Sequence, residues 1–307
     1  MVCRHPPDDL LPLLRRGSCW ALTAPHGRRW IAPQAIGYPV GCMQSEATGE
    51  FGISVVQTAL ATAIGGRSEQ QDRAAGWCSA GGRHGLWVVA DGMGGHAGGA
   101  LAAQTVVEVA ARHWLPTAAE WVQPDTLLED LCLAAHEEIN RRGAAAGLAP
   151  HSTLVVLYLQ PESAWWVHVG DSRLYRFRDG VLLYRTRDHS VAQAWIDQAW
   201  VDPGGSAEKD GRISPSRHVL TTAVGGTMPP RMAHGHALRD RRDGWVLCTD
   251  GLWEGVREDD LAEALRAPDL QRAAEGLVQQ AVERNGPNGD NVTVLLLREG
   301  SGTTRVG

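Results

Sequence analysis

The strongest constraint on the fold is a set of short apolar runs, most of which meet an acidic residue at one end. They are rich in β-branched and aromatic residues and are bounded by Gly, Asp or Pro, which is typical of β-strands. The runs are LWVVAD (86–91), STLVVLYL (152–159), WWVHVGD (165–171), RLYRF (173–177), WVLCTD (245–250) and NVTVLLL (291–297). In RFRDGVLLYR, Asp179-Gly180 separates two apolar runs and predicts a hairpin.

Helical spacing of apolar residues marks the stretches around these runs. The predicted helices cover 97–114, 126–142, 258–266 and 269–286, and the last ends at an Asn-Gly stop. Two helices, a run of strands, two more helices and a final strand do not alternate as a doubly wound sheet would. The order predicts an α+β fold in which sheets pack together with helices outside.

Length and composition suit one large domain or two small ones, since the chain has 307 residues of which 43% are hydrophobic. Residues 1–52 show no sustained period, and we expect an N-terminal extension there, one domain over 53–300, and a tail over 301–307. The formal net charge of -6 argues against a general nucleic-acid binder, which needs a basic face.

Cysteine usage and hydropathy indicate where such a chain would work. The six cysteines form no C-x-x-C pair, which favours neither structural zinc nor a disulfide framework. The run ISVVQTALATAIGG (53–66) is too short to span a membrane and carries Gln57, and no signal peptide is evident. The sequence therefore predicts a soluble cytoplasmic protein that does not bind membranes.

Four acidic residues lie at the ends of predicted strands: Asp91, Asp171, Asp250 and Asp290. Each one taken alone is better explained as a helix N-cap or a turn acid, and only the four together weaken that interpretation. If they share one sheet edge, two carboxylates about 4 Å apart repel by roughly 4 kcal/mol at an effective dielectric near 20. Such a cluster persists only with protons or bound cations, and all-oxygen ligands select Mg²⁺, Mn²⁺ or Ca²⁺.

The glycines of VVADGMGGHAGG (88–99) admit two interpretations. In the first, Gly92 lets the backbone turn sharply after Asp91 and offers its carbonyl to a metal ion. In the second, the loop cradles a phosphate. The spacing is not G-x-G-x-x-G and no Lys-Ser/Thr follows, so the metal interpretation is favoured.

The chain resembles the metal-dependent Ser/Thr protein phosphatases (the PPM, or type 2C, family), above all their compact bacterial members. The resemblance spans about 53–298 and rests on six motifs in the family order. They are VVADGMGGHAGG, GDSRLYRFRDG, TRDHSVAQ, RHVLTTAVGG, LCTDGLW and GDNVTVLLL. It implies two stacked antiparallel β-sheets flanked by helices, an α-β-β-α sandwich.

The resemblance also implies a metal centre with Mn²⁺ or Mg²⁺ as cofactor. Asp91 would bridge two ions, with the Gly92 carbonyl on the second. Asp250 and Asp290 would hold the first ion.

Further positions carry over less directly. Several family members hold a third, looser ion, for which Asp171 is the implied ligand and Glu254 a weaker one. The early family motif G-x-R-x-x-x-E-D corresponds to GGRSEQQDR, where Arg67 would bind the substrate phosphate and Asp72 stands at the motif's Asp. A planar bidentate donor suits phosphate, although an exposed surface charge is the plain alternative for Arg67.

Two departures from the family pattern bear on the chemistry. Gln71 replaces the motif's Glu, which puts the affinity for the second ion in doubt; if this segment is a strand, Glu69 would share its face and compensate. Many eukaryotic relatives have a His where this chain has Met93, as bacterial members do. We do not transfer that residue's general-acid role to His96, for which helix capping or solvent exposure is expected, and His189 is expected to be structural.

The function implied is hydrolysis of phosphoserine and phosphothreonine in proteins by a water that bridges two metal ions. No C-x₅-R or G-x-S-x-G nucleophile motif is present. Implied partners are phosphoproteins made by a Ser/Thr kinase, and the kinase itself. The alternatives are a catalytically impaired binding or regulatory module, supported only by Gln71, and a metal-dependent phosphohydrolase acting on a small molecule. The segment 197–217 suits a loop that sets specificity.

Overall fold

The computed structural model describes residues 55–79, 84–117, 123–197 and 219–300, all within one compact unit of the chain. The expected extension over 1–52, the tail over 301–307 and nearly all of the loop 197–217 lie outside the described residues. Among the described helices, none combines the length and the apolar character that a membrane span needs.

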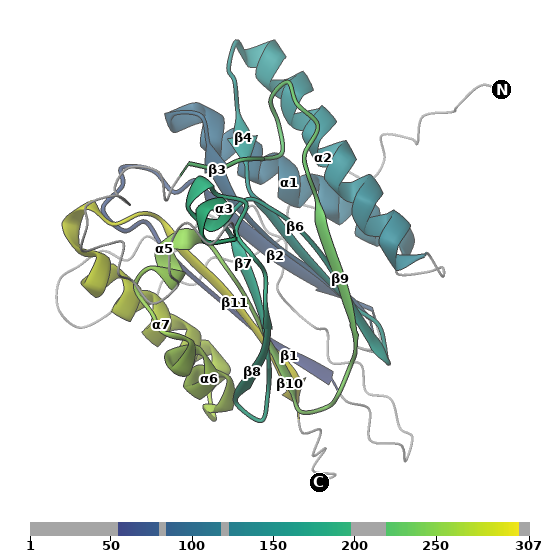
Figure 1. The fold of residues 1–307 in the computed structure, drawn as a ribbon, viewed down its shortest axis with the longest axis vertical. Helices are drawn as coiled ribbons and strands as arrows, with labels where there is room; N and C mark the ends of the chain where they lie inside the picture. The colour runs from purple at the N-terminus through teal and green to yellow at the C-terminus, as the bar shows by residue number, and fades with distance from the viewer. Residues whose placement is uncertain (1–54, 80–83, 118–122, 198–218, 301–307) are drawn as a thin grey trace, which may run out of the picture. The chain divides into compact units, whose positions relative to one another are not determined.

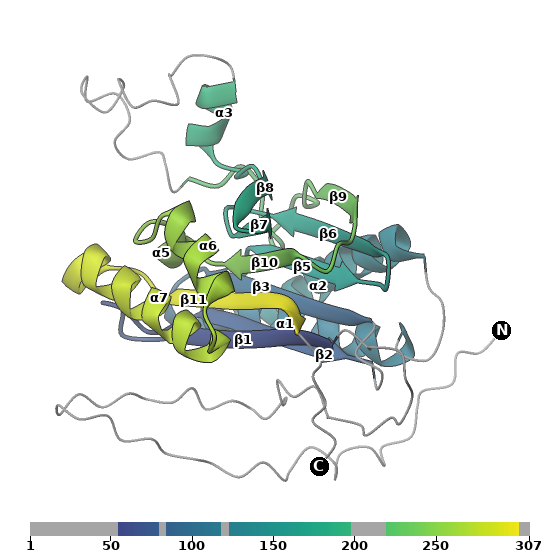
Figure 2. The same cartoon turned by 90° about the horizontal axis from the view of Figure 1, so that it is seen from below.

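Two antiparallel sheets are stacked face to face (Figures 1 and 2). The first sheet has the spatial order β1 (Val55–Ala63), β11 (Val292–Gly300), β10 (Asp243–Cys248), β7 (Arg173–Arg178) and β8 (Val181–Arg185). The second has the order β2 (Asp72–Cys78), β3 (Gly85–Met93), β5 (Leu154–Leu159), β6 (Ser163–Val169) and β9 (Ala233–Leu238), with β4 (His151–Ser152) beside β3.

Helices cover the outer face of each sheet. The second sheet carries α1 (His96–Thr117) and α2 (Pro124–Ala146). The first carries α5 (Asp250–Trp253), α6 (Glu258–Arg266) and α7 (Leu270–Asn285), which is followed by the 3₁₀ turn η2 (Gly286–Asn288). A short helix, α3 (Val191–Asp197), follows β8 in the chain. The predicted α-β-β-α sandwich is confirmed.

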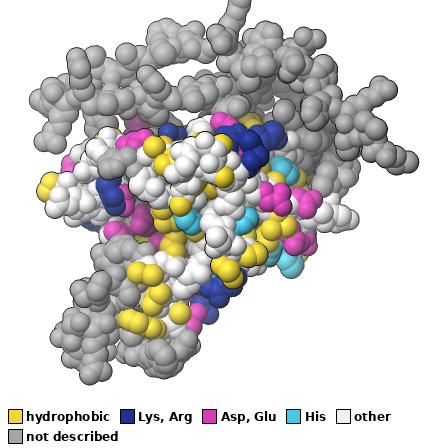
Figure 3. Space-filling model, turned by 90° about the horizontal axis from the view of Figure 1, so that it is seen from above, with side chains coloured by type: hydrophobic (Ala, Val, Ile, Leu, Met, Phe, Trp, Pro, Cys, Tyr) yellow, Lys and Arg dark blue, Asp and Glu magenta, His cyan; other side chains and the backbone are white. Residues whose placement is uncertain are grey.

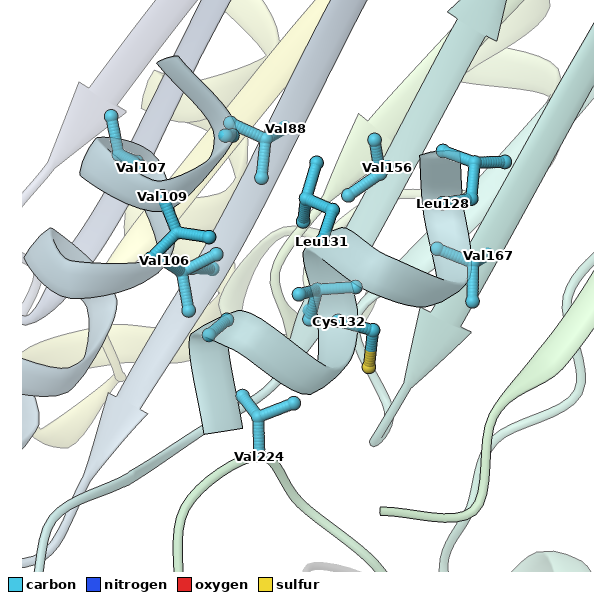
Figure 4. Packing of buried hydrophobic residues seen from close by; sticks show 14 of the residues in the cluster. Val88, Val106, Val107, Val109, Leu128, Leu131, Cys132, Val156, Val167 and Val224 are labelled. Carbon is cyan, nitrogen blue, oxygen red and sulfur yellow. The ribbon is translucent and has the colours of Figure 1, made fainter. Parts of the chain in front are cut away.

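Three apolar cores separate the four layers, and the two-residue period of the strands distributes side chains between them. In β3, Leu86 and Val88 pack against α1 and α2, whereas Trp87 and Val89 pack between the sheets. Figure 4 shows the first of these cores, with Val88 beside side chains of both helices. Burial on both faces explains why the central strands are almost continuously apolar in sequence.

Most predicted elements are present, and the hairpin is confirmed. Asp179 and Gly180 both have positive φ (52° and 80°), as the tight turn between β7 and β8 requires. Strands β1, β2 and β9 were not predicted, and each lies at an edge of its sheet. In the view of Figure 3, the described surface mixes acidic, basic and histidine side chains instead of presenting one sign of charge.

Candidate metal centre

Five carboxylates come from both sheets to the same end of the sandwich, where β3 ends and α5 and β11 begin (Figure 1). Asp72 and Asp91 are register partners on β2 and β3 of the second sheet. Asp250 is the first residue of α5 and is separated from β10 only by Thr249, and Asp290 stands just before β11. Asp171 lies in the crossing from β6 to β7, which joins the two sheets.

These carboxylates are close enough to raise one another's pKa. Burial raises the pKa of Asp91 well above its ordinary value, and the charges of Asp72, Asp250, Asp171 and Asp290 raise it further. Burial also raises the pKa of Asp250 well above its ordinary value, and three of the same acids contribute. Several negative charges at this spacing require protons or cations to coexist.

Asp72 links the two sheets through a threonine. Its Oδ2 accepts a hydrogen bond from Thr249 Oγ1 at 2.8 Å, and Thr249 Oγ1 in turn accepts from the backbone N–H of Thr293 at 3.1 Å. Burial raises the pKa of Asp72 to about 7, even though hydrogen bonds from the Thr249 and Thr293 side chains favour the carboxylate. Asp72 therefore positions β2 against β10 and β11, directly beside Asp91.

The backbone of Asp91 is held by residues of the neighbouring strands. Its N–H donates to Thr153 Oγ1 at 2.9 Å, and its carbonyl accepts from the N–H of Thr153 (2.9 Å) and from Ser152 Oγ (3.0 Å). Thr153 Oγ1 also shares a hydrogen bond with Ser172 Oγ at 2.7 Å. Gly170, at φ 101°, lies so close that an added Cβ would come within 2.7 Å of Thr153 Cγ2.

The expected sharp turn at Gly92 is wrong, because β3 continues through Gly92 to Met93, where it pairs with β4. The reversal occurs at Gly94 and Gly95, which have φ of 117° and 79°. Gly92 is required for a different reason. A Cβ there would lie 2.0 Å from the carbonyl oxygen of Gly99 in α1, so only glycine permits the helix to start this close to the strand.

Arg67 is brought to the acidic end by a turn and not by a strand. Its Nη2 donates to Asp290 Oδ2 at 2.5 Å, and its side chain is 55% exposed, so it is accessible to a ligand. Gly65 and Gly66 pack onto the loop that precedes β11. An added Cβ at Gly65 would lie 2.0 Å from the carbonyl oxygen of Asp290.

Asn291 fastens this turn to the start of β11 with three hydrogen bonds. Its Oδ1 accepts from the N–H of Gln71 at 2.8 Å, and its Nδ2 donates to the carbonyls of Ile64 (2.8 Å) and Glu69 (3.0 Å). Asn291 is buried, with 4% of its surface exposed. The position of Arg67 therefore depends on a side chain far away in the sequence.

The proposed compensation of Gln71 by Glu69 is not supported, because residues 65–71 form a turn and β2 begins only at Asp72. The two side chains therefore do not share a strand face. Gln71 Nε2 donates to the carbonyl of Gly95 at 3.2 Å, which places the amide at the loop between β3 and α1. Gln71 thus lies at the acidic end as the motif predicts, but acts there as a hydrogen-bond donor.

Asp171 and Glu254 both face this end. The charge of Glu254 contributes to the raised pKa of Asp250 and of Asp171, whose pKa is about 7 mainly because of burial and then of Asp188. Glu254 is exposed, whereas Asp171 is buried and its carbonyl accepts from the indole N–H of Trp253 at 3.0 Å.

The structure describes the side chain of His189 but not that of His96. His189 is structural, as expected: its Nδ1 accepts from the N–H of Gly170 at 3.2 Å, and its ring stacks on His168 at 4.5 Å. Helix α1 begins at His96, and its side chain lies outside the described residues.

The oxygen atoms present fit a hard cation. Asp250 Oδ1 and Asp72 Oδ1 are buried and have no hydrogen-bond partner among the described residues. Within that part of the chain, no three Asp, Glu, His or Cys side chains already surround one point as metal ligands would. The fit therefore rests on the mutual repulsion, the two unpartnered oxygens and an all-oxygen donor set.

Sequence reasoning missed three residues that position the site: Thr153, Thr249 and Asn291. Thr249 and Asn291 stand directly beside predicted ligands, in LCTDGLW and GDNVTVLLL. Adjacency to an acid at a strand end was the available signal, but nothing in the sequence indicated their hydrogen-bond partners.

Comparison with known proteins gives consistent results. A family model described as protein phosphatase 2C matches residues 62–284. Serine/threonine protein phosphatase PstP of Mycobacterium tuberculosis is 31% identical over 220 residues, which cover 69% of this chain and 40% of PstP. The chain thus spans about two fifths of the length of this curated relative.

Solved structures are similar over most of their length. PppA of Pseudomonas aeruginosa, described as a key regulatory component of T6SS, is 29% identical with a TM-score of 0.65, covering 81% of this chain and 99% of PppA. The catalytic domain of PstP in complex with two manganese ions is 28% identical with a TM-score of 0.65, covering 80% of this chain and 99% of that one. The match of sequence motifs, fold and family model shows that this chain belongs to the protein phosphatase 2C family.

Proposed function

We propose that the chain is a metal-dependent protein phosphatase that hydrolyses phosphoserine and phosphothreonine. The observation that carries the proposal is the convergence of Asp72, Asp91, Asp171, Asp250 and Asp290 beside Arg67. A buried acidic cluster next to an exposed guanidinium suits a phosphate ester bound between cations and arginine. The two manganese ions of the related PstP structure support the same view.

Each residue has a distinct role in this proposal. Asp91 would contribute to the sites of two Mn²⁺ or Mg²⁺ ions, and the Gly92 carbonyl would help to hold the second. Asp250 and Asp290 would hold the first ion, and Asp171, helped by Glu254, would hold a third. Gln71 would take the place of a carboxylate near the second ion.

The remaining residues orient these groups and the substrate. Asp72 fixes β2 and its charge beside Asp91 through Thr249. Arg67 leaves Asp290 and donates its planar fork to the phosphoryl oxygens, where it balances their charge. When bound, the metal ions would lower the pKa of a water and neutralise charge on the phosphoryl group.

The test is hydrolysis of a phosphothreonine peptide by the purified chain in EDTA, Mg²⁺ or Mn²⁺. We expect turnover only with metal, and a loss of at least about 100-fold in kcat/KM for Asp91→Asn and for Asp250→Asn. Asp130→Asn is the matched control, because Asp130 is an exposed acid on α2. ATP tested in parallel separates a protein phosphatase from a small-molecule phosphohydrolase.

Other outcomes would redirect the proposal. No turnover of the peptide by the wild type at any metal concentration would contradict it and favour a phosphoprotein-binding module. Faster turnover of ATP than of the peptide would favour the small-molecule enzyme. If Gln71→Glu reaches half-maximal turnover at a lower metal concentration than the wild type, the weakened second metal site lies at Gln71.

The wider assignments belong to the same proposal. The substrates would be targets of a Ser/Thr kinase, including the kinase itself, in the cytoplasm. The phosphatase domain would cover 53–300, with 1–52 and 301–307 outside it. Loop 197–217 would contribute to the choice of substrate.

A further inference from the structure

A cavity of about 310 Å³ lies at the opposite end of the first sheet from the acidic site. It is bordered by the β7–β8 turn and the loop before β10, and by the C-terminal ends of α6 and β11. Strand β10 runs from Asp243 at this cavity to Cys248 beside the acids, a span of about 17 Å at the usual rise per residue. The cavity is therefore separate from the proposed catalytic centre.

Four arginines border the cavity: Arg241, Arg242, Arg266 and Arg298. Three carboxylates border it as well, but each is already paired with an arginine and does not leave a free negative charge. The pairs are Asp243 with Arg176 and Arg178, Glu299 with Arg239, and Asp179 with Arg242.

Two of the four arginines are engaged by the protein. Arg298 Nη1 donates to the carbonyls of Leu265 (3.0 Å) and Ala267 (2.5 Å) at the end of α6. Arg242 pairs with carboxylates of neighbouring turns. Arg241 and Arg266 are exposed, and neither has an ion pair or side-chain hydrogen bond with any described residue. Among the described residues, the cavity is thus bordered by two guanidinium groups without a protein partner, Arg241 and Arg266, and by Arg298, whose charge no carboxylate balances, in a chain whose net charge is -6.

The β7–β8 turn leaves room for one of these two guanidinium groups. Gly180 has φ 80°, and a Cβ added there would come within 2.5 Å of Arg266 Nη1. The absent side chain lets the Arg266 fork lie against the turn at the edge of the cavity.

We infer that this cavity is a second anion site, which binds the dianion of a phosphate monoester or of free phosphate through Arg241 and Arg266. Guanidinium forks match the oxygens of a phosphate group and bind it with charge-assisted hydrogen bonds. Because the carboxylates of the wall are already neutralised, they oppose an incoming anion only weakly. The site goes beyond the proposed activity, since the strand length separates it from the acidic end.

The test is equilibrium dialysis of the full chain, loaded with Mn²⁺, against radiolabelled inorganic phosphate. We expect two classes of site per chain, one of which is weakened at least about tenfold in Arg241→Gln/Arg266→Gln. Arg67→Ala should affect only the other class. Arg112→Gln, which changes an exposed arginine on α1, should affect neither.

The outcomes separate this inference from the proposed function. Binding to a single class that disappears in Arg67→Ala and persists in the double variant would overturn the second site and leave the catalytic proposal intact. A phosphothreonine peptide titrated into the Asp91→Asn background identifies the source of the anion. If the double substitution weakens binding of the peptide, the site's ligand is a docked phosphoprotein. If it weakens binding of free phosphate alone, the ligand is the released product.

A folding control completes the experiment. Arg241 and Arg266 are exposed and have no side-chain partner in the part of the chain that the structure describes, so the double variant should melt within a few degrees of the wild type. Unchanged affinity for both probes in a folded double variant would overturn the inference.

Discussion

At the scale of single residues, the candidate site depends on short polar side chains as much as on the acids. Thr249 and Asn291 each stand next to a proposed ligand. Each forms hydrogen bonds with polar groups of segments that lie far away in the sequence. Their hydroxyl and amide groups are buried, so each lost contact would leave an unpaired polar atom in the interior. The geometry of Arg67 and Asp72 is thus determined by residues that bind no ligand.

Replacing Asn291 with Ala tests this dependence. The variant would leave the N–H of Gln71 and the carbonyls of Ile64 and Glu69 without their partner, at a cost of about 2–3 kcal/mol in the free energy of unfolding. The loosened turn would also misplace Arg67 and raise KM for a phosphopeptide. Urea denaturation and steady-state kinetics measure the two effects.

The control for that variant is Asn288→Ala, which changes an exposed asparagine of the same loop. It should alter stability by less than about 0.5 kcal/mol. Equal effects of the two substitutions would contradict the role of Asn291.

At the scale of elements, sheet position decides which strands are visible in the sequence. The central strands β3, β5, β10 and β11 are buried on both faces and are continuous apolar runs. Of the three unpredicted edge strands, β2 (DRAAGWC) and β9 (AHGHAL) have no β-branched residue, whereas β1 (VVQTALATA) has several and is not explained in this way. An edge strand is formed by pairing with its neighbour, so its own sequence needs less apolar character.

Replacing two glycines with alanine, one packed tightly and one exposed, tests the effect of close packing and the effect of helix propensity separately. A Cβ at Gly255 would lie 2.6 Å from Ala281 Cα, so Gly255→Ala should push α5 away from α7 and cost about 2–3 kcal/mol. Gly276 is exposed in the middle of α7, and no atom of the described residues lies within 4 Å of an added Cβ. Gly276→Ala should therefore stabilise the protein by about 0.5–1 kcal/mol.

Thermal or urea unfolding of both variants provides the measurement. Both substitutions are Gly→Ala, so opposite signs of their changes in the free energy of unfolding report only the surroundings of each glycine. Destabilisation by Gly276→Ala, or tolerance of Gly255→Ala, would refute the packing argument.

At the scale of the whole molecule, polar contacts connect the two halves of the sandwich in addition to the apolar core between the sheets. His168 of β6 stacks on His189, which follows β8 of the other sheet, and His168 is only 2% exposed. Burial lowers the pKa of His168, and lowers that of His189 to about 4, with the charges of His168 and Arg231 acting in the same direction and Asp188 opposing them.

This pair makes stability depend on pH with a defined sign. A histidine whose pKa is depressed by folding takes up its proton on unfolding, so its stabilisation is present above about pH 6.5 and is lost as the pH falls toward 4. Between pH 7 and pH 5, the free energy of unfolding should fall by about 1 kcal/mol more in the wild type than in His189→Asn. This value includes a reduction for solvent screening, because His189 is partly exposed. The variant keeps an acceptor for the N–H of Gly170.

Urea titrations of both proteins at the two pH values, with Mn²⁺ present throughout, check this difference. The comparison cancels the contribution of the buried carboxylates, which both proteins share. If the free energy of unfolding fell more in the variant than in the wild type between pH 7 and pH 5, the proposed sign would be wrong.

The sequence alone determined the layered α+β architecture, the hairpin at Asp179-Gly180 and the placement of acids such as Asp91 and Asp250 at strand ends. These features follow from local periodicity and turn chemistry, which neighbouring residues specify. Only the tertiary structure decided that the reversal occurs at Gly94 and Gly95 instead of Gly92, and that Asn291 holds the turn carrying Arg67. The physical reason is that close backbone approach and buried hydrogen bonds join segments distant in the chain, whose meeting no local pattern encodes.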